Sequence, residues 1–383
     1  MYLRRLTLHN FRVYESLQLE LQAGLTVFVG PNAAGKTSLL EAMYLLAATK
    51  SPRTNSDCEL VRWGAQVGRV EGLFVTRRER ELRLAVGLDP SCAVGANPKR
   101  LEVEGEVVPT AAQMIGHAQV VMFAPDDLAI IKGGPGLRRR FLNTALAQLQ
   151  PRYLDDLTRY RRALRQRNEL LKTLGRAGGT PALRGSGGLG ELEAWTEQLV
   201  QSGAAVALAR QRFVLALSQH AGEVHHLIGA EETLSLEYHG ELAEAPDEAT
   251  AGAHFRQRLA DLADLEVRRG TTLVGPHRDE LQVNVNGASV RQYGSQGQQR
   301  TAALSLKLGQ ARVTQEWSDE PPLLLLDDCL SELDPTRAKA VLDLGATLDG
   351  LIVTSAKLDP ALQDRAEAQV LEVRGGRVEA WEG

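Results

Sequence analysis

The sequence predicts an α/β fold that is interrupted by a long, mainly helical insertion. Two apolar runs, at 25–29 and 323–326, have the length and composition of buried parallel strands. Between these runs, residues 137–174 and 192–217 carry apolar side chains at helical spacing, and the stretch at 175–190 that joins them is rich in glycine. Two helices joined by such a turn form a hairpin, so we expect an arm inserted into the α/β part.

These patterns divide the 383 residues into three parts, at 1–134, 135–265 and 266–383. We expect the first and last parts to form two lobes of one head and the middle part to form the helical arm. The composition is typical of a soluble globular protein, with 43% hydrophobic and 24% charged residues. No secretory signal or membrane-spanning run is seen, and the three cysteines are scattered, which favours the cytoplasm and no membrane partner.

The remaining elements follow from local patterns. Residues 2–21 and 67–108 alternate apolar and polar side chains, which predicts antiparallel strands, and 118–123 is typical of a short buried strand. A helix at about 247–264 is expected to pack on the base of the arm. After the insertion, the patterns predict a hairpin turning at Asn286-Gly287, a helix to about Trp317, a helix at 335–348, a strand at 351–354 and a hairpin turning at Gly375-Gly376.

The stretch after the first buried strand has the pattern of a phosphate-binding loop, which is Gly, four residues, then Gly-Lys-[Ser/Thr] between a strand and a helix. Backbone N–H groups of such a loop, together with the helix N-terminus, hold phosphate groups. Lys36 is placed to reach the β- and γ-phosphates of ATP, and Thr37 to bind Mg²⁺. The residues expected to bind the nucleotide here are Gly30, Pro31, Asn32, Ala33, Ala34, Gly35, Lys36, Thr37 and Ser38.

Two acids follow the second buried strand. Because parallel strands deliver their carboxyl ends to one edge of a sheet, we expect Asp327 and Asp328 beside the phosphate-binding loop. Asp327 would hold Mg²⁺ through water, and Asp328 is placed to polarise the water that attacks ATP. Lys36, Asp327 and Asp328 are therefore the candidate catalytic residues, and Thr37 and Asp327 are the candidate metal ligands.

Two further loops resemble motifs of ATP-binding-cassette ATPases. Residues 330–334 resemble the D-loop, and 294–300 resemble the signature loop, which in that superfamily contacts the ATP of the opposing subunit. A serine hydroxyl, a glycine backbone and a helix N-terminus suit that task. The alternative for 294–300 is a solvated loop that caps a helix. The residues expected to bind nucleotide across a dimer are Ser295, Gln296, Gly297 and Gln298.

More specific motifs occur along nearly the whole chain. They include Leu8-x-Asn10-Phe11-Arg12, Pro125-x-Asp127-Leu128, Gly133-Gly134-Pro135-x-x-Arg138-Arg139, Gly275-Pro276-His277-Arg278-Asp279 and Ser295-Gln296-Gly297-Gln298-Gln299-Arg300-Thr301. With these motifs the sequence resembles the bacterial RecF family of recombination mediators. The resemblance implies an α/β, two-lobed ABC-type ATPase head with an inserted, mainly helical arm domain, and it adds Arg12 to the residues expected to bind nucleotide.

The resemblance also implies a function. The family assists a recombinase at single-stranded gaps in gap repair and replication restart, with RecR and RecO as partners. We therefore expect an ATP-dependent homodimer that binds DNA, both double-stranded and at single-strand/double-strand junctions. Ser355 or Ala356 occupies the usual position of the switch histidine, and Asp328 replaces a longer glutamate, so we expect slow ATP hydrolysis that resets the dimer.

The predicted arm is strongly basic, although the whole chain has a formal charge of −4. The segment from Arg138 to Arg176 contains eleven Lys or Arg residues and only three acidic residues. Such a stripe can neutralise DNA phosphates, and the alternative is a solvated helix face. The candidate DNA-binding residues are Arg159, Arg162, Arg165 and Lys172.

Some features stay open at this stage. His277 is either part of a structural hydrogen-bonded cluster or catalytic, and Gln113 and Gln119 are the nearby candidates for the Q-loop glutamine. A transporter's nucleotide-binding subunit is a competing function, but the basic insertion and the missing switch histidine count against it. A long-armed chromosome-organising or DNA-tethering ATPase is the other alternative, and it would need a far longer coiled coil.

Overall fold

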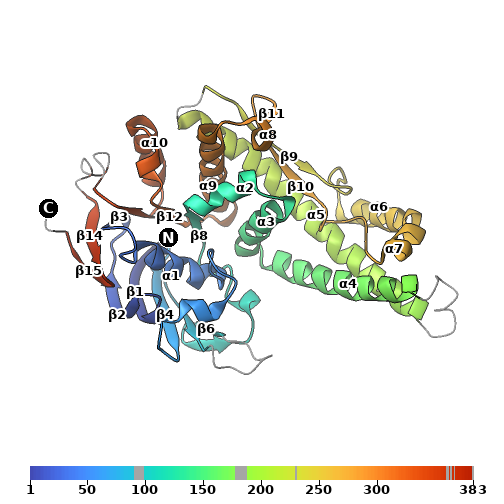
Figure 1. The fold of residues 1–383 in the computed structure, drawn as a ribbon, viewed down its shortest axis with the longest axis horizontal. Helices are drawn as coiled ribbons and strands as arrows, with labels where there is room; N and C mark the ends of the chain where they lie inside the picture. Colours follow the sequence, from blue (N-terminus) through green and yellow to red (C-terminus); the bar gives the residue numbers. More distant parts are fainter. Residues whose placement is uncertain are drawn as a thin grey trace.

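The computed structural model describes residues 1–89, 99–176, 188–228, 231–358, 362, 365 and 367–381. The predicted glycine-rich turn at 175–190 therefore lies mostly outside the described residues. The chain forms a head with two six-stranded sheets and one three-stranded sheet, from which an arm of long helices projects (Figure 1). The predicted α/β fold with a helical insertion is confirmed.

One six-stranded sheet, here called the parallel sheet, positions the predicted nucleotide site. Its order is β15-β14-β3-β13-β12-β8, and β15 pairs antiparallel with β14 while the other neighbours are parallel. Every residue of β12 is buried, as expected for a strand covered on both faces. The strands are β3 (Gly24–Val29), β8 (Val120–Phe123), β12 (Leu323–Asp327), β13 (Gly350–Ser355), β14 (Gln369–Arg374) and β15 (Arg377–Ala380).

The second six-stranded sheet is antiparallel, in the order β2-β1-β4-β5-β6-β7. Helix α1 (Lys36–Ala48) lies between the two sheets, and its side chains share one apolar core with both. Because α1 is covered on both sides, nearly all of its residues are buried. The strands are β1 (Tyr2–Phe11), β2 (Tyr14–Glu20), β4 (Gly68–Val75), β5 (Glu81–Leu88), β6 (Lys99–Val103) and β7 (Glu106–Val108).

The three-stranded sheet, in the order β11-β10-β9, supports the rest of the head. Its strands are β9 (Leu234–His239), β10 (Glu280–Val285) and β11 (Ala288–Ser289), the last two turning at Asn286-Gly287 as predicted. Long helix α5 (Gly188–Leu227) packs on β9 and on α9 (Gln296–Ser318). Strand β9 was not predicted. It lies in the predicted arm part (135–265) but pairs with β10, which lies in the predicted second lobe (266–383). The three-part division of the chain therefore remains an interpretation.

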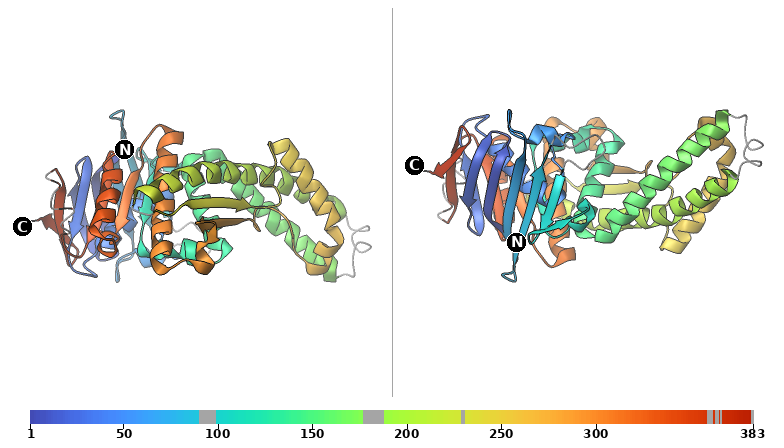
Figure 2. Two further views of the ribbon diagram at one scale, coloured as in Figure 1. Left: turned by 90° about the horizontal axis from the view of Figure 1, so that it is seen from above. Right: turned by 90° about the horizontal axis from the view of Figure 1, so that it is seen from below.

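The arm is a hairpin of α4 (Pro151–Arg176) and the outer part of α5, which run side by side (Figure 2). Helix α3 (Pro135–Leu149) leads into the arm. It ends before Pro151, which is the first residue of α4 and suits the start of a helix. Helices α6 (Glu248–Asp261) and α7 (Ala263–Arg269) lie beside the outer part of the arm, not at its base as predicted. Within this contact, buried Arg167 of α4 pairs with Glu266 of α7 at 2.7 Å.

Shorter elements complete the head. They are α2 (Leu128–Lys132), α8 (Val290–Tyr293), α10 (Pro335–Gly345) and the 3₁₀ turns Asp57–Leu60, Ala111–Gln113, Pro125–Asp127 and Leu330–Glu332. Within the described part of the chain, no helix has the length and apolar character needed to cross a membrane.

Candidate nucleotide site

The loop between β3 and α1 requires glycine at two positions. A Cβ at Gly30 would lie 2.2 Å from the carbonyl oxygen of Val373, which is too close for any side chain. Gly35 has φ +115°, and a Cβ there would lie 2.7 Å from the hydroxyl of Tyr14. That hydroxyl donates a hydrogen bond to the carbonyl of Gly35 at 3.1 Å. The neighbouring strands therefore shape the loop, and α1 begins directly after it with its N-terminus toward the cleft.

Lys36 is the first residue of α1, and its side chain folds back along the loop. Its ammonium group donates to the carbonyl oxygens of Gly30 at 2.7 Å and Pro31 at 2.9 Å. Burial lowers the pKa of Lys36, whereas the carboxylates of Asp328 and Asp327 oppose that shift. The loop thus holds a cation where phosphates are expected, and the two predicted acids lie close enough to act on its charge.

Asp327, at the end of β12, is held by two threonine hydroxyls. Thr37 donates to Oδ1 of Asp327 at 3.0 Å, and Thr354 of β13 donates to the same oxygen at 2.7 Å. Burial raises the pKa of Asp327, and the bonds from Thr354 and Thr37 act in the opposite direction. A hydroxyl beside one carboxylate suits Mg²⁺, which keeps several waters and completes its shell with phosphate oxygens. The predicted metal ligands therefore lie together and fit the ion.

Asp328 adopts a left-handed backbone conformation, with φ 46°. Its N–H is satisfied by the carbonyl of Thr354 at 3.2 Å and by the hydroxyl of the same residue at 3.0 Å. Thr354 therefore fixes both acids, a role that the sequence pattern did not reveal. The left-handed turn is costly for a residue with a Cβ, and here it aims the Asp328 side chain into the cleft.

The cleft has a volume of about 350 Å³. Eight of its lining residues belong to the predicted loop, the start of α1 and the two acids, and the other two are Val13 and Arg53. Arg53 was not predicted, and it places a guanidinium on the rim. Predicted Arg12 points elsewhere, because it forms two bonds of 2.8 and 2.7 Å with the buried carboxylate of Glu41. Arg12 therefore contacts α1 through Glu41, and it is not among the described residues that line the cleft.

The predicted signature residues lie away from this cleft, and none of them is among its described lining residues. Ser295 caps α9, since its hydroxyl accepts from the N–H of Gln298 at 3.2 Å. The side chain of Gln298 accepts from the N–H of Ser295 at 2.8 Å and donates to Glu232 at 2.6 Å. Ser295, Gln296 and Gly297 are exposed. The alternative of a helix cap is thus realised, and it leaves the loop accessible to another molecule.

Comparison with known proteins decides the family. A family described as AAA ATPase domain matches residues 1–99. The DNA replication and repair protein RecF of Exiguobacterium sp. strain AT1b is 38% identical, covering 99% of both chains. The chain belongs to the RecF family. RecF of Listeria welshimeri is 40% identical over 89% of both chains.

Solved structures agree with this assignment. A structure described as the recombination mediator protein RecF with ATP in the RecFOR pathway superposes with a TM-score of 0.86, at 30% identity, covering 99% of this chain and 97% of that one. An Smc head domain from Pyrococcus furiosus superposes with a TM-score of 0.56 at 17% identity, covering 99% of this chain and 96% of that one, and this likeness shows the fold alone. The RecF-family chain thus has an ATPase head with a helical insertion.

The segment after β8 also reaches the nucleotide edge of the parallel sheet. Oδ2 of Asp127 accepts from the N–H of Ala124 at 2.9 Å, and Oδ1 lies 3.2 Å from the ammonium of Lys307 on α9. Gln119 lies at the opposite end of β8, and Gln113 lies in the 3₁₀ turn before it. Neither Q-loop candidate therefore lies at the edge that residues 124–127 reach, and the position of the Q-loop glutamine stays a prediction.

The arm carries less free charge than the sequence suggested. Arg138 and Arg167 are buried and paired with Glu280 and Glu266, which lie outside the counted segment. Lys172 pairs with Glu169 on the same helix at 2.9 Å. The predicted DNA-binding residues are all exposed, and they are Arg159, Arg162, Arg165 and Lys172. The guanidinium of Arg162 stacks on the ring of Trp195 at 5.7 Å.

His277 belongs to a hydrogen-bonded cluster at the base of the arm. Its Nδ1 lies 2.6 Å from the hydroxyl of Tyr160, and its Nε2 lies 3.2 Å from the carbonyl of Thr272. Burial lowers the pKa of His277 to about 4, so the ring is neutral at neutral pH. These contacts favour the structural interpretation of the Gly275–Asp279 motif.

Proposed function

We propose that this chain is an ATP-dependent DNA-binding recombination mediator that acts in gap repair and replication restart. One observation carries the proposal: the nucleotide cleft and the signature loop lie on different surfaces of one chain. The cleft around Lys36 is open, and the exposed cap at Ser295 is free to contact a second molecule. Two copies can therefore complete each other's sites, so that ATP acts as a dimerisation switch.

ATP and Mg²⁺ are the proposed cofactors. When bound, Mg²⁺ would offset phosphate charge and polarise the γ-phosphate. The Lys36 ammonium, held by carbonyl oxygens in this structure, is within reach of phosphates seated in the loop. The hydroxyl of Thr37 and the carboxylate of Asp327 would hold the metal, and Asp328 would orient water. Since Ser355 and Ala356 supply no switch histidine, we expect slow hydrolysis that resets the dimer.

DNA and two partner proteins complete the proposal. The similar RecF structures are described as parts of the RecFOR pathway, which supports RecR and RecO as partners of this chain. We propose that the ATP-bound homodimer binds double-stranded DNA next to a single-stranded gap. There it would help RecR and RecO to load the recombinase. Exposed basic side chains on the arm and head supply the charge that sequence-independent DNA binding needs.

The test is sedimentation of the chain with ATP, Mg²⁺ and gapped DNA. Lys36→Met should lose ATP binding, whereas Ser295→Arg should bind ATP and remain monomeric. Gln257→Arg is the matched control, because it adds the same charge at an exposed site on α6 and should dimerise as the wild type does. A Ser295→Arg variant that dimerised normally would refute the signature assignment. If the wild-type chain with ATP did not bind gapped DNA, the proposed mediator function would be refuted.

A further inference from the structure

A second cleft lies between the head and the root of the arm. Its volume is about 730 Å³, within the range of ligand-binding pockets. The walls come from the segment after α1, from α3 and from the first turns of α4, which lie next to one another in Figure 1. Five of its lining residues are basic, and among the described lining residues none is Asp or Glu. The basic residues are Lys50, Arg139, Arg140, Arg161 and Arg210.

Two of the five have structural roles at the back of the cleft. Arg210 is almost fully buried and donates to Tyr153, Asn143 and the carbonyl of Pro276. Arg139 donates to the carbonyl of Asp279 at 2.7 Å. These side chains are committed to the protein, although they still add positive charge to the cleft.

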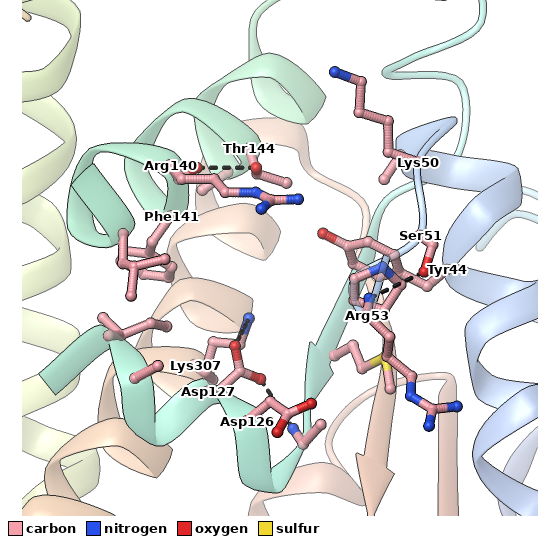
Figure 3. Close-up of a pocket in the computed structure, with 18 of the residues that line it drawn as sticks. Tyr44, Lys50, Ser51, Arg53, Asp126, Asp127, Arg140, Phe141, Thr144 and Lys307 are labelled. Carbon is pink, nitrogen blue, oxygen red and sulfur yellow. Dashed lines mark hydrogen bonds and ion pairs between the residues drawn. The ribbon is translucent and has the colours of Figure 1, made fainter. Parts of the chain in front are cut away.

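The other three have no carboxylate partner within the described chain. Arg140 makes one long contact of 3.4 Å with the side-chain oxygen of Asn55, and no ion pair is formed by Lys50 or Arg161. Asp57, whose charge acts on Lys50, is already paired with Lys99. Figure 3 is a close-up of the adjoining pocket, which Asp126 and Asp127 also line, and it shows Arg140 extending from α3 toward the segment that carries Lys50. Lys50, Arg140 and Arg161, none of which forms an ion pair with a described residue, thus line one cleft.

The electrostatics agree with this geometry. Burial lowers the pKa of Lys50, and the charges of Lys99, Arg161 and Arg140 lower it further. Burial also lowers the pKa of Arg161, and the charge of Arg210 acts in the same direction. Lys50, Arg140 and Arg161 are exposed to solvent. Like charges that are held close together still raise each other's free energy, and an anion among them would remove that cost.

We propose that this cleft binds the phosphate backbone of DNA through Lys50, Arg140 and Arg161. The inference rests on the proposed function, since it names where DNA binds. Two features favour a polymer over a free phosphate. A single phosphate would fill little of the cleft, whereas Leu154, Leu157 and Leu164 offer apolar contact for sugars beside the cations. Exposed Arg165 also lies one turn beyond Arg161 on α4 and extends the positive surface out of the cleft.

The outer end of the arm offers a matched control for the cleft residues. Arg268 and Arg269 are exposed on α7, and neither is among the described residues that line the cleft. Removing these two charges therefore changes the charge of the arm region by the same amount without changing the cleft.

The test compares Arg140→Ala/Arg161→Ala with Arg268→Ala/Arg269→Ala. Binding of fluorescent gapped DNA is measured by anisotropy with ATP and Mg²⁺ over a range of salt concentrations. Each phosphate contact contributes a slope of about 0.9 in log K against log salt, so two lost contacts should reduce the slope by about 1.8. At 0.1 M salt this corresponds to roughly 60-fold weaker binding. The control should bind within about threefold of wild type, and both variants should bind ATP normally.

The other outcomes overturn the proposal, and they show whether the proposed function fails with it. If wild type binds DNA and the cleft variant binds equally well, DNA lies elsewhere and the proposed function stands. If wild type with ATP binds no DNA, the proposed function fails as well. A third arm adds inorganic phosphate alone and follows thermal unfolding. If phosphate stabilises wild type but not the cleft variant, while the DNA affinities of both are equal, the cleft is a site for a free anion.

Discussion

Replacing Thr354 by valine should disable the metal end of the nucleotide site while keeping the strand in place. The hydroxyl donates to Asp327 at 2.7 Å and accepts from the N–H of Asp328 at 3.0 Å. Thr354 is fully buried in the middle of the parallel sheet. Valine has nearly the same shape, so the main change is the loss of these two hydrogen bonds.

The size of the effect follows from the charge of Asp327. A hydrogen bond to a charged group contributes about 1.5–3 kcal/mol, which is roughly 10- to 150-fold in an equilibrium constant. Burial raises the pKa of Asp327, and the bond from Thr354 is the largest effect that opposes it. Without that bond the protonated carboxyl is favoured further. Mg²⁺ needs the carboxylate. As the pH is lowered, metal-dependent ATP binding should therefore be lost at a higher pH in the variant than in wild type.

The assay is ATP affinity with Mg²⁺ and with EDTA, measured between about pH 5 and pH 8 for wild type, Thr354→Val and Thr354→Ser. Serine keeps the hydroxyl and should follow wild type. The reasoning is refuted if the valine variant has the same Mg²⁺ dependence and the same pH curve as wild type. Thermal unfolding at each pH shows whether the variant is folded.

Three further predictions concern the arm and its junction with the head. Arg167→Met should lower the free energy of unfolding, measured in urea, by about 3–5 kcal/mol, because Glu266 is left buried without its cation. Adding Glu266→Leu should restore most of this free energy. A single variant as stable as wild type would contradict the prediction. Gly309→Val should destabilise by about 1–3 kcal/mol, since a Cβ there lies 2.8 Å from the N of Ala221, whereas Gly136→Ala, with open space around it, should be near neutral. The pKa of His277 is lowered to about 4, so wild type should lose thermal stability as the pH falls from about 6.5 toward 4, and His277→Gln should lose less.

Local sequence patterns were sufficient to predict the nucleotide edge. The phosphate-binding loop and the pair Asp327-Asp328 each follow a continuous apolar run, and buried parallel strands place such segments side by side. The Asn286-Gly287 turn was predictable for a similar reason, because its left-handed backbone limits the choice of residues.

Long-range partners account for what the sequence did not show. Thr354 is an ordinary strand residue until β12 and β13 are in register, with Asp327 paired to it. The charge of the arm was overestimated because Glu266 and Glu280, which neutralise Arg167 and Arg138, are about 100 or more residues away in the chain. Lys50, Arg140 and Arg161 come from three separate segments, and each one alone is an unremarkable surface cation.

The contacts of α9 connect the signature loop to the arm. Ser295 caps this helix, Lys307 in its middle is paired with Asp127 of the 3₁₀ turn after β8, and Gly309 allows it to lie against the backbone of α5. Because α5 continues into the arm beside α4, the signature loop and the arm belong to one packed body. In the proposed dimer, Ser295 of one copy meets the ATP held by Lys36 of the other. The nucleotide in each copy would therefore set the position of its partner's arm, and DNA between the two arms would be held only while both sites are filled.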